Sequence, residues 1–152
     1  MPSVTIIMGS KSDGDCMKNC EEYLNYFGIS YDVKILSAHR NPDEVADFAR
    51  NAEKNGVKVI IAAAGMAAHL GGVVAAHTIL PVLGVPMKGG VMDGLDALLS
   101  MVQMPAGVPV PTLAVGNAGA RNAAVTAAQI LALNDISLKE KLIEFKRNGC
   151  KV

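Results

Sequence analysis

Residues 57–72 read VKVIIAAAGMAAHLGG, a nearly continuous aliphatic run that gives way to alanine and glycine. Such a run is typical of a strand buried on both faces, and the change to small residues indicates a tight loop at its carboxyl end. The loop carries His69, and the small residues around it leave room for another backbone or a ligand. A histidine at the end of a buried strand is a candidate for proton transfer.

Strand and helix patterns alternate on both sides of this run. Apolar runs predict further strands at 4–8, 31–36, 81–85 and 112–115. Helical spacing of apolar residues, with glycine, proline or asparagine at several ends, predicts helices at 13–27, 41–55, 70–78, 95–103, 120–133 and 138–148. Because parallel strands need crossover connections, this order predicts one doubly wound α/β domain, with a parallel sheet, spanning residues 1–152.

The charge of the chain argues against two classes of partner. Fourteen basic and fourteen acidic residues cancel, so the sequence lacks the positive charge typical of nucleic-acid binding and of binding to membrane surfaces. The N-terminus does not have the pattern of a signal peptide, and no apolar run is long enough for a membrane span. We therefore expect a cytoplasmic protein that binds neither nucleic acid nor membrane.

The apolar content points to contacts between subunits. Hydrophobic residues make up 51% of the chain and charged residues 18%, which predicts that part of the surface is buried in an assembly. Methionines and leucines within residues 87–112 recur at helical spacing, a pattern more typical of a core or an interface than of a cofactor site. We interpret this region as an interface, and so predict a homo-oligomer.

The cysteines and histidines lack the spacing of a metal site. Cys16 and Cys20 are one helical turn apart, Cys150 is near the end of the chain, and no CxxC pair occurs. The three histidines are scattered at positions 39, 69 and 77. We expect Cys16 and Cys20 to be buried or half-buried thiols, and we predict no metal.

The loop after the first predicted strand, GSKSD at 9–13, has features of a phosphate site. Gly9 is permissive, Ser10 and Ser12 offer hydroxyl donors, and the following helix N-terminus attracts anions. The loop lacks the Gly-Lys-Ser/Thr ending of a P-loop and is not GxGxxG, so neither a nucleoside triphosphate nor a dinucleotide is favoured. The Asp13 carboxylate can accept hydrogen bonds from sugar hydroxyls. The alternative is that Ser12 or Asp13 only caps the helix.

The loop after the second predicted strand contains Ser37, Ala38, His39 and Arg40. Arginine can bind a phosphate through two donors at once, and here it adjoins a titratable imidazole. Ligands of parallel α/β sheets bind beyond the carboxyl ends of the strands. We therefore expect His39 and His69 to lie at the same edge of the sheet, and we predict that at least one of them is catalytic.

Five segments together resemble the PurE family of purine biosynthesis: MGSKSD at 8–13, SAHR at 37–40, AGMAAHLGG at 64–72, SMVQMPAGVPV at 100–110 and AGARNAA at 118–124. The resemblance extends over almost the whole chain, and the AAHL and SMVQMP segments are similar to the bacterial type of the family. It implies a flavodoxin-like three-layer sandwich, assembled as an octamer with sites near subunit boundaries. It also implies that no metal or organic cofactor takes part.

The resemblance implies a reaction as well as a fold. In the bacterial type, the carboxylate of N5-carboxyaminoimidazole ribonucleotide moves from the exocyclic nitrogen to C4 of the same ring. The phosphate of this small nucleotide suits Ser10, Ser12 and Arg40. His39 is the expected proton shuttle, and His69 is expected to orient the carboxylate and the trapped CO2. The substrate-binding residues expected are Gly9, Ser10, Ser12, Asp13, Ser37, Ala38, Arg40, Gly65, Met66, Ala67 and Leu70.

Two other functions stay open at this point. The first is direct carboxylation of aminoimidazole ribonucleotide with CO2 or bicarbonate. The second is a non-catalytic module that binds a nucleoside monophosphate. A response regulator is disfavoured, because GSKSD follows the first strand where an acidic pair would be needed.

Two positions depart from the family's usual pattern. Gly71 replaces the proline that is common in the family as HLPG, and Gly89 follows Lys88 where a serine is frequent. Glycine leaves more backbone freedom to be lost on folding than proline does. We therefore predict that Gly71→Pro leaves activity equal or higher.

Overall fold

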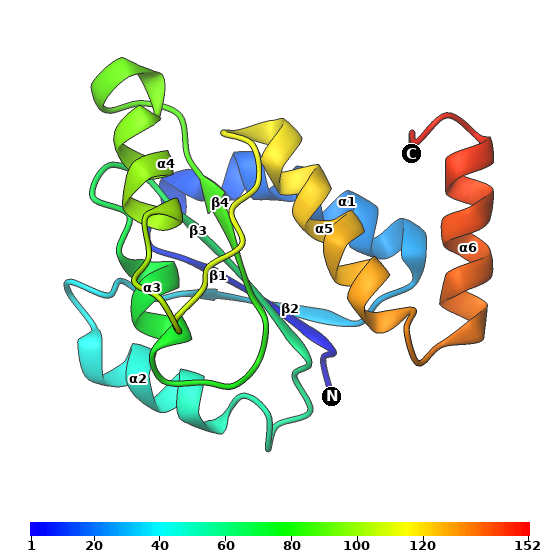
Figure 1. The fold of residues 1–152 in the computed structure, drawn as a ribbon, viewed down its shortest axis with the longest axis horizontal. Coiled ribbons are helices and arrows are strands. Elements are labelled where there is room, and N and C mark those ends of the chain that lie inside the picture. The colour runs from blue at the N-terminus through cyan, green and yellow to red at the C-terminus, as the bar shows by residue number, and fades with distance from the viewer.

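Four parallel strands form the central sheet of the computed structural model, which describes residues 1–152 (Figure 1). They are β1 (Val4–Met8), β2 (Tyr31–Ile35), β3 (Val59–Ala64) and β4 (Val82–Pro86), in the spatial order β2-β1-β3-β4. β1 therefore lies between the other two strands of the N-terminal half, with Val4 opposite both Tyr31 and Val59. This order brings the loops that follow β2 and β3 to either side of the end of β1.

The predicted fifth strand at 112–115 is wrong in its extent. Only Thr112 pairs with β4, through a single parallel bridge to Gly84. The Gly84 N–H donates to the Pro111 carbonyl at 2.8 Å, and the Leu113 N–H donates to the Gly84 carbonyl at 2.9 Å. The next donor on β4 would be Pro86, which has no N–H, and Gly116 rather than Val115 donates to the Pro86 carbonyl at 2.9 Å, so the ladder does not continue through 113–115.

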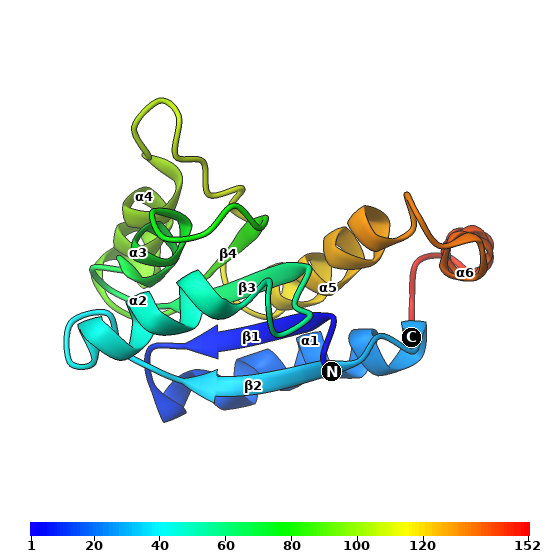
Figure 2. The same ribbon diagram turned by 90° about the horizontal axis from the view of Figure 1, so that it is seen from below.

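The six predicted helices are all present, with shifted ends. They are α1 (Gly14–Phe27), α2 (Pro42–Asn51), α3 (Leu70–Ala75), α4 (Leu95–Val102), α5 (Asn117–Leu131) and α6 (Ile136–Arg147), with short 3₁₀ turns η1 (Lys11–Asp13) and η2 (Val91–Asp93). Helices cover both faces of the sheet (Figure 2). None of them has the length and hydropathy needed to cross a lipid bilayer.

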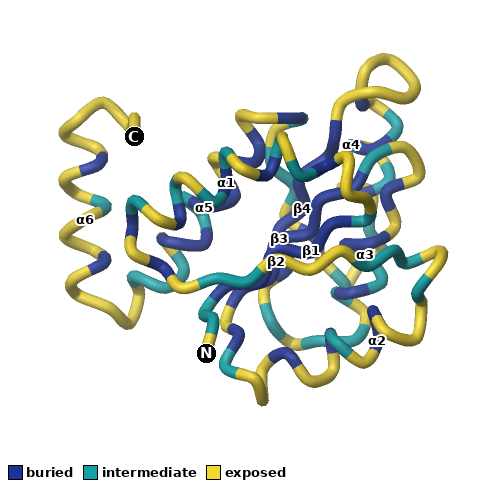
Figure 3. Tube along the Cα trace, turned by 180° about the vertical axis from the view of Figure 1, so that it is seen from behind, coloured by how far each residue is buried: buried dark blue, intermediate teal, exposed yellow.

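Two apolar clusters, one on each face, hold the layers together. Val4, Ile6 and Met8 of β1 pack in the cluster that includes α1 and α5, whereas Ile7 packs in the cluster of α2, α3 and α4. This alternation is the two-residue period of a strand buried on both faces. β1, β3 and β4 are buried throughout (Figure 3), so the carboxyl ends of these strands are fixed in position.

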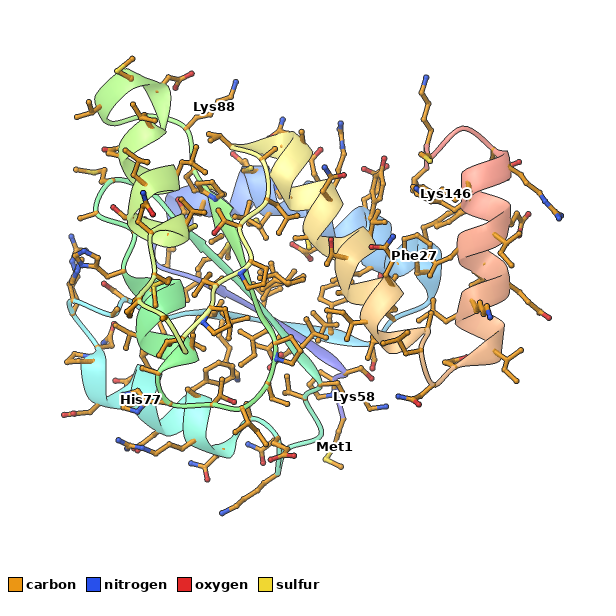
Figure 4. All side chains as sticks on the ribbon, in the orientation of Figure 1. Met1, Phe27, Lys58, His77, Lys88 and Lys146 are labelled. Carbon is orange, nitrogen blue, oxygen red and sulfur yellow. The ribbon has the colours of Figure 1, made fainter.

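An aromatic cluster attaches the last helix. Phe145 of α6 is buried against Tyr23, Tyr26 and Phe27 of α1, with ring centroids 5.2–5.9 Å apart. Figure 4 shows Phe27 on the side of α1 that faces α6. Edge-to-face aromatic pairs of this kind add to the stabilisation that comes from buried area.

Candidate active site

A cavity of about 570 Å³ lies at the carboxyl ends of the strands. All the residues predicted to be catalytic or substrate-binding line it. Gly9, Ser10, Ser12 and Asp13 come from the loop after β1; Ser37, Ala38, His39 and Arg40 from the loop after β2; Gly65, Met66, Ala67, His69 and Leu70 from the loop after β3. The strand order thus brings together three turns that are far apart in the sequence.

The two histidines contact each other directly. Nε2 of His39 lies 2.8 Å from Nδ1 of His69, and the two rings are perpendicular with centroids 5.0 Å apart. A hydrogen bond of this kind needs a proton on one nitrogen and a lone pair on the other. Both side chains are exposed at the cavity, so a ligand can reach them. The pair can therefore hold one proton between two rings at the edge of the cavity.

The first loop presents two hydroxyls side by side. Ser12 Oγ donates to Ser10 Oγ at 2.9 Å, and the Ser12 N–H also points at Ser10 Oγ, at 3.3 Å. Ser10 is the N-cap of η1, whereas Asp13 makes no capping hydrogen bond to α1. Neither the Ser12 nor the Asp13 side chain therefore caps α1, so the alternative that they serve only as helix caps is not supported. Both serines are exposed and can bind an anion at this helix start.

Asp13 is the one acidic side chain that lines the cavity, and it is largely buried. Burial raises the pKa of its carboxyl, and a hydrogen bond from the Ser10 backbone opposes that rise. A largely buried carboxyl group has little water to accept hydrogen bonds from, so hydroxyl donors of a ligand are favourable partners. The carboxyl group can therefore bind a polar ligand in the cavity, and it has little contact with solvent.

The second loop is closed by its own hydrogen bonds. The Asn41 N–H donates to the Ser37 carbonyl at 2.7 Å, and the Arg40 N–H donates to Ser37 Oγ at 3.3 Å. These bonds hold His39 at the tip of the turn. The chain contains three ion pairs between side chains, and Arg40 takes part in none of them. Its guanidinium group can therefore bind an anionic ligand without first breaking an ion pair.

The third loop turns sharply before α3. The Ala68 N–H donates to the Met66 carbonyl at 2.9 Å, and the His69 N–H donates to the Ala67 carbonyl at 2.8 Å. His69 stands at the N-cap of α3 but makes no side-chain capping bond, so its imidazole stays available for His39. The alanines and glycine predicted to leave space do so.

Sequence reasoning missed the fourth loop of the cavity. Met87, Lys88, Gly89 and Gly90 follow β4 and line the same space, as does Ala64 at the end of β3. The rule that places ligands at carboxyl ends of strands applies equally to β4, so the run MKGG was a usable signal. Figure 4 shows Lys88 at this end of the molecule.

The thiols and the acidic groups do not form a second reactive centre. No three His, Cys, Asp or Glu side chains are grouped so that they could hold a metal ion. Cys20 is buried and Cys16 half-buried, as predicted, and burial raises the pKa of both thiols. Raised thiol pKa values make these cysteines poor nucleophiles near neutral pH.

Comparison with known proteins identifies the family of the chain. Residues 3–151 match the family described as AIR carboxylase. The chain belongs to the AIR carboxylase family. It is 52% identical to N5-carboxyaminoimidazole ribonucleotide mutase of Haemophilus influenzae, over 95% of this chain and 88% of that protein. It is 54% identical to the mutase of Vibrio parahaemolyticus, over 94% of this chain and 89% of that protein.

Solved structures place the fold in the same family. The crystal structure of Treponema denticola PurE has a TM-score of 0.88 and 27% identity, and the match covers 99% of this chain and 92% of that one. The resemblance to PurE proteins seen in the sequence is thereby confirmed, and so is the flavodoxin-like α/β fold.

Restoring proline at Gly71 tests whether the departure of this AIR carboxylase family member from the usual HLPG pattern affects its activity or stability. It is the second residue of α3, within the first turn, where N–H groups have no partner in the helix and proline is tolerated. We expect Gly71→Pro to keep the activity and to raise the free energy of unfolding by about 0.4–1 kcal/mol, because proline restricts the unfolded chain. Thermal unfolding and steady-state kinetics measure both effects.

The matched variant Gly71→Ala separates packing from backbone restriction. A Cβ at this position would lie 3.3 Å from Cγ1 of Val110, which must move by a few tenths of an ångström. A loss of stability in both variants would assign the cost to Val110. A loss in the proline variant alone would mean that the backbone at Gly71 does not suit proline, contrary to our prediction.

Proposed function

We propose that this chain is an N5-carboxyaminoimidazole ribonucleotide mutase. It moves the carboxylate from the exocyclic nitrogen to C4 of the imidazole ring and forms 4-carboxy-5-aminoimidazole ribonucleotide, a step in the de novo synthesis of purines (IMP). Relatives of that name share 51–54% identity with it over most of both chains. The observation that carries the proposal is the His39–His69 contact at 2.8 Å, in one cavity with two exposed serines and an unpaired arginine.

The proton balance of this reaction suits a histidine pair. When the N–CO2⁻ bond breaks, its electrons return to nitrogen, which takes up one proton and stays on the ring as the amino group while CO2 is released. C4 then attacks CO2, a C–C bond forms, and C4 loses one proton as the ring regains aromaticity. One proton is given and one is taken back, so a single acid–base group is enough.

His39 is the proposed acid–base group, and His69 is its partner. His39 stands at the tip of the second loop with its Nε2 directed at His69 Nδ1. An imidazole gains and loses protons near neutral pH, and a neighbouring ring that accepts or donates a hydrogen bond fixes its orientation. The backbone amides of residues 65–67, which donate to no backbone carbonyl, supply further donors for the carboxylate and for CO2.

The remaining groups fit the rest of the nucleotide. We assign the phosphate to Ser10, Ser12 and Arg40 and the ribose hydroxyls to Asp13, while the small imidazole ring lies against the alanine and glycine residues of the third loop. Ser37 and Ala38 line the same cavity. Holding CO2 beside C4 avoids a bimolecular capture, an effect that reaches about 7–11 kcal/mol at its ideal limit.

The assembly and the setting are part of the proposal. We expect one catalytic domain over residues 1–152, a cytoplasmic homo-octamer, and no metal, organic cofactor, nucleic acid or membrane partner. Exposed apolar side chains on η2 and α4 support an interface there: Val91, Met92, Leu95, Leu99 and Val102. The mass of the assembly in sedimentation equilibrium tests the octamer.

The decisive experiment compares two substrates on the purified protein. We expect N5-carboxyaminoimidazole ribonucleotide to be converted without added bicarbonate, and faster than it decays without protein. Conversion of aminoimidazole ribonucleotide that depends on added bicarbonate, with no use of the carboxylated substrate, would instead identify a direct carboxylase. Binding of the nucleotides without turnover of either would identify a non-catalytic module.

A further inference from the structure

Met66 stands out among the residues that line the cavity. Three large apolar side chains lie there, and two of them, Leu70 and Met87, are buried in the protein with 2% and 5% exposure. Met66 is 67% exposed. Its side chain is thus the one large apolar group at the cavity that the core does not hold in place.

The backbone at Met66 is in a conformation that favours glycine. Its φ is 56°, in the left-handed region, where a side chain crowds the following carbonyl. The turn made here leads through Ala67 and Ala68 to His69. Glycine would form the same turn without strain, so the turn itself does not require a methionine. Strain that is kept at the edge of a site indicates that the side chain has a task there.

The polar character of the cavity defines that task. Ser10, Ser12, His39 and Arg40 are exposed along it, so water has access from this side. Released CO2 is small, apolar and easily lost, and capture by C4 depends on keeping it in place. A long, unbranched, flexible thioether can cover an irregular opening without forming a fixed contact beforehand.

We infer that Met66 is a positioning residue that covers the opening of the cavity over the bound nucleotide and keeps released CO2 beside C4. This inference rests on the proposed mutase function. The side chain takes no proton and forms no bond; it limits exchange of CO2 with the solvent. Its contribution is therefore to the fate of CO2 and not to the cleavage of the N–CO2⁻ bond.

The test measures exchange of CO2 during turnover. The parent protein, Met66→Gly and Met66→Leu are each given N5-carboxyaminoimidazole ribonucleotide in ¹³C-labelled bicarbonate with carbonic anhydrase, and label in the C4 carboxylate is measured by mass spectrometry. We expect Met66→Gly to raise the labelled fraction by about tenfold. Met66→Leu, which keeps a long apolar side chain on the same strained backbone, should stay within about twofold of the parent.

Thermal unfolding separates this role from a structural one. Relief of the strained φ should leave the melting temperature of Met66→Gly equal to or above that of the parent. An unchanged labelled fraction in Met66→Gly, with normal conversion, would overturn the inference alone. A lower melting temperature or a changed oligomer mass would overturn it too, because Met66 would then pack between copies. A parent that does not convert the carboxylated substrate would overturn the proposed function and this inference together.

Discussion

His39→Asn is expected to lower kcat for the conversion of N5-carboxyaminoimidazole ribonucleotide by about 10²–10⁴-fold. Asparagine removes the imidazole, and its side chain ends before the position of Nε2, so the 2.8 Å contact with Nδ1 of His69 is lost as well. It cannot take up or release a proton near neutral pH. Both proton transfers of the reaction lose their acid–base group, while the contacts to phosphate and ribose stay in place.

Binding and turnover must be measured separately to test this prediction. We expect the Kd of the product nucleotide, measured by calorimetry, to change by no more than about threefold, since the contacts to phosphate and ribose are kept and the lost hydrogen bond joins two protein side chains. His77→Asn is the matched control. His77 does not line the cavity, and Figure 4 shows it near the bottom of the view, whereas Lys88 is near the top. The kcat of His77→Asn should equal that of the parent.

His69→Asn ranks the two histidines. If His39 exchanges protons with the substrate and His69 orients it, the His69 variant should lose less activity than the His39 variant. The reverse order would exchange the two roles. A His39→Asn protein that keeps a tenth or more of the parent kcat would show that the proton moves through another group, and the proposed mechanism would be wrong.

The site could be located from the sequence because three turns follow three parallel strands. Strands in a parallel sheet all end at the same edge, so a histidine after residue 36 and another after residue 64 had to lie on the same side of the molecule. The contact between the rings of His39 and His69 could not be predicted from the strand ends alone. It depends on β1 standing between β2 and β3, and strand order is set by the path of each crossover, which no local pattern records.

The errors also have identifiable physical causes. Apolar residues at 112–115 predicted a strand, but Pro86 of the neighbouring strand has no N–H with which to continue the ladder past Leu113. Lys88 was missed because residues 87–112 were interpreted as an interface, although the run MKGG follows β4. A Cβ on Gly116 would meet the stem of Lys88 at 3.2 Å, so the lysine lies over a glycine that is 28 positions further along the chain. Pairings at such separation are not visible in residue spacing.

Gly119→Ala is expected to have the largest effect on stability. Gly119 lies in the first turn of α5, and a Cβ there would overlap the carbonyl oxygen of Ala114 and lie 2.7 Å from its carbonyl carbon. A backbone carbonyl cannot rotate away as a side chain can, so α5 must shift. We expect the free energy of unfolding to fall by about 3 kcal/mol, although alanine is the better helix former by about 1 kcal/mol.

A loss of this size lowers the melting temperature of a 150-residue domain by about 6–12 °C, which calorimetry resolves readily. Gly14→Ala is the control, since Gly14 begins α1 with a φ of −58° and a Cβ there would meet nothing within 4 Å. It should leave stability equal or slightly higher. If Gly119→Ala had the same melting temperature as the parent, α5 would not pack on Ala114.

The same variant connects stability with the cavity. The segment between Ala114 and α5 is joined to β4 by the Gly116 N–H, which donates to the Pro86 carbonyl at 2.9 Å, and Lys88 lies against Gly116. A shift of α5 therefore reaches the fourth loop of the cavity. In folded Gly119→Ala at low temperature we expect KM to rise more than kcat falls, because the loop lines the binding space but contains neither histidine. A fall in kcat alone would show that the strain passes instead to the His39–His69 pair.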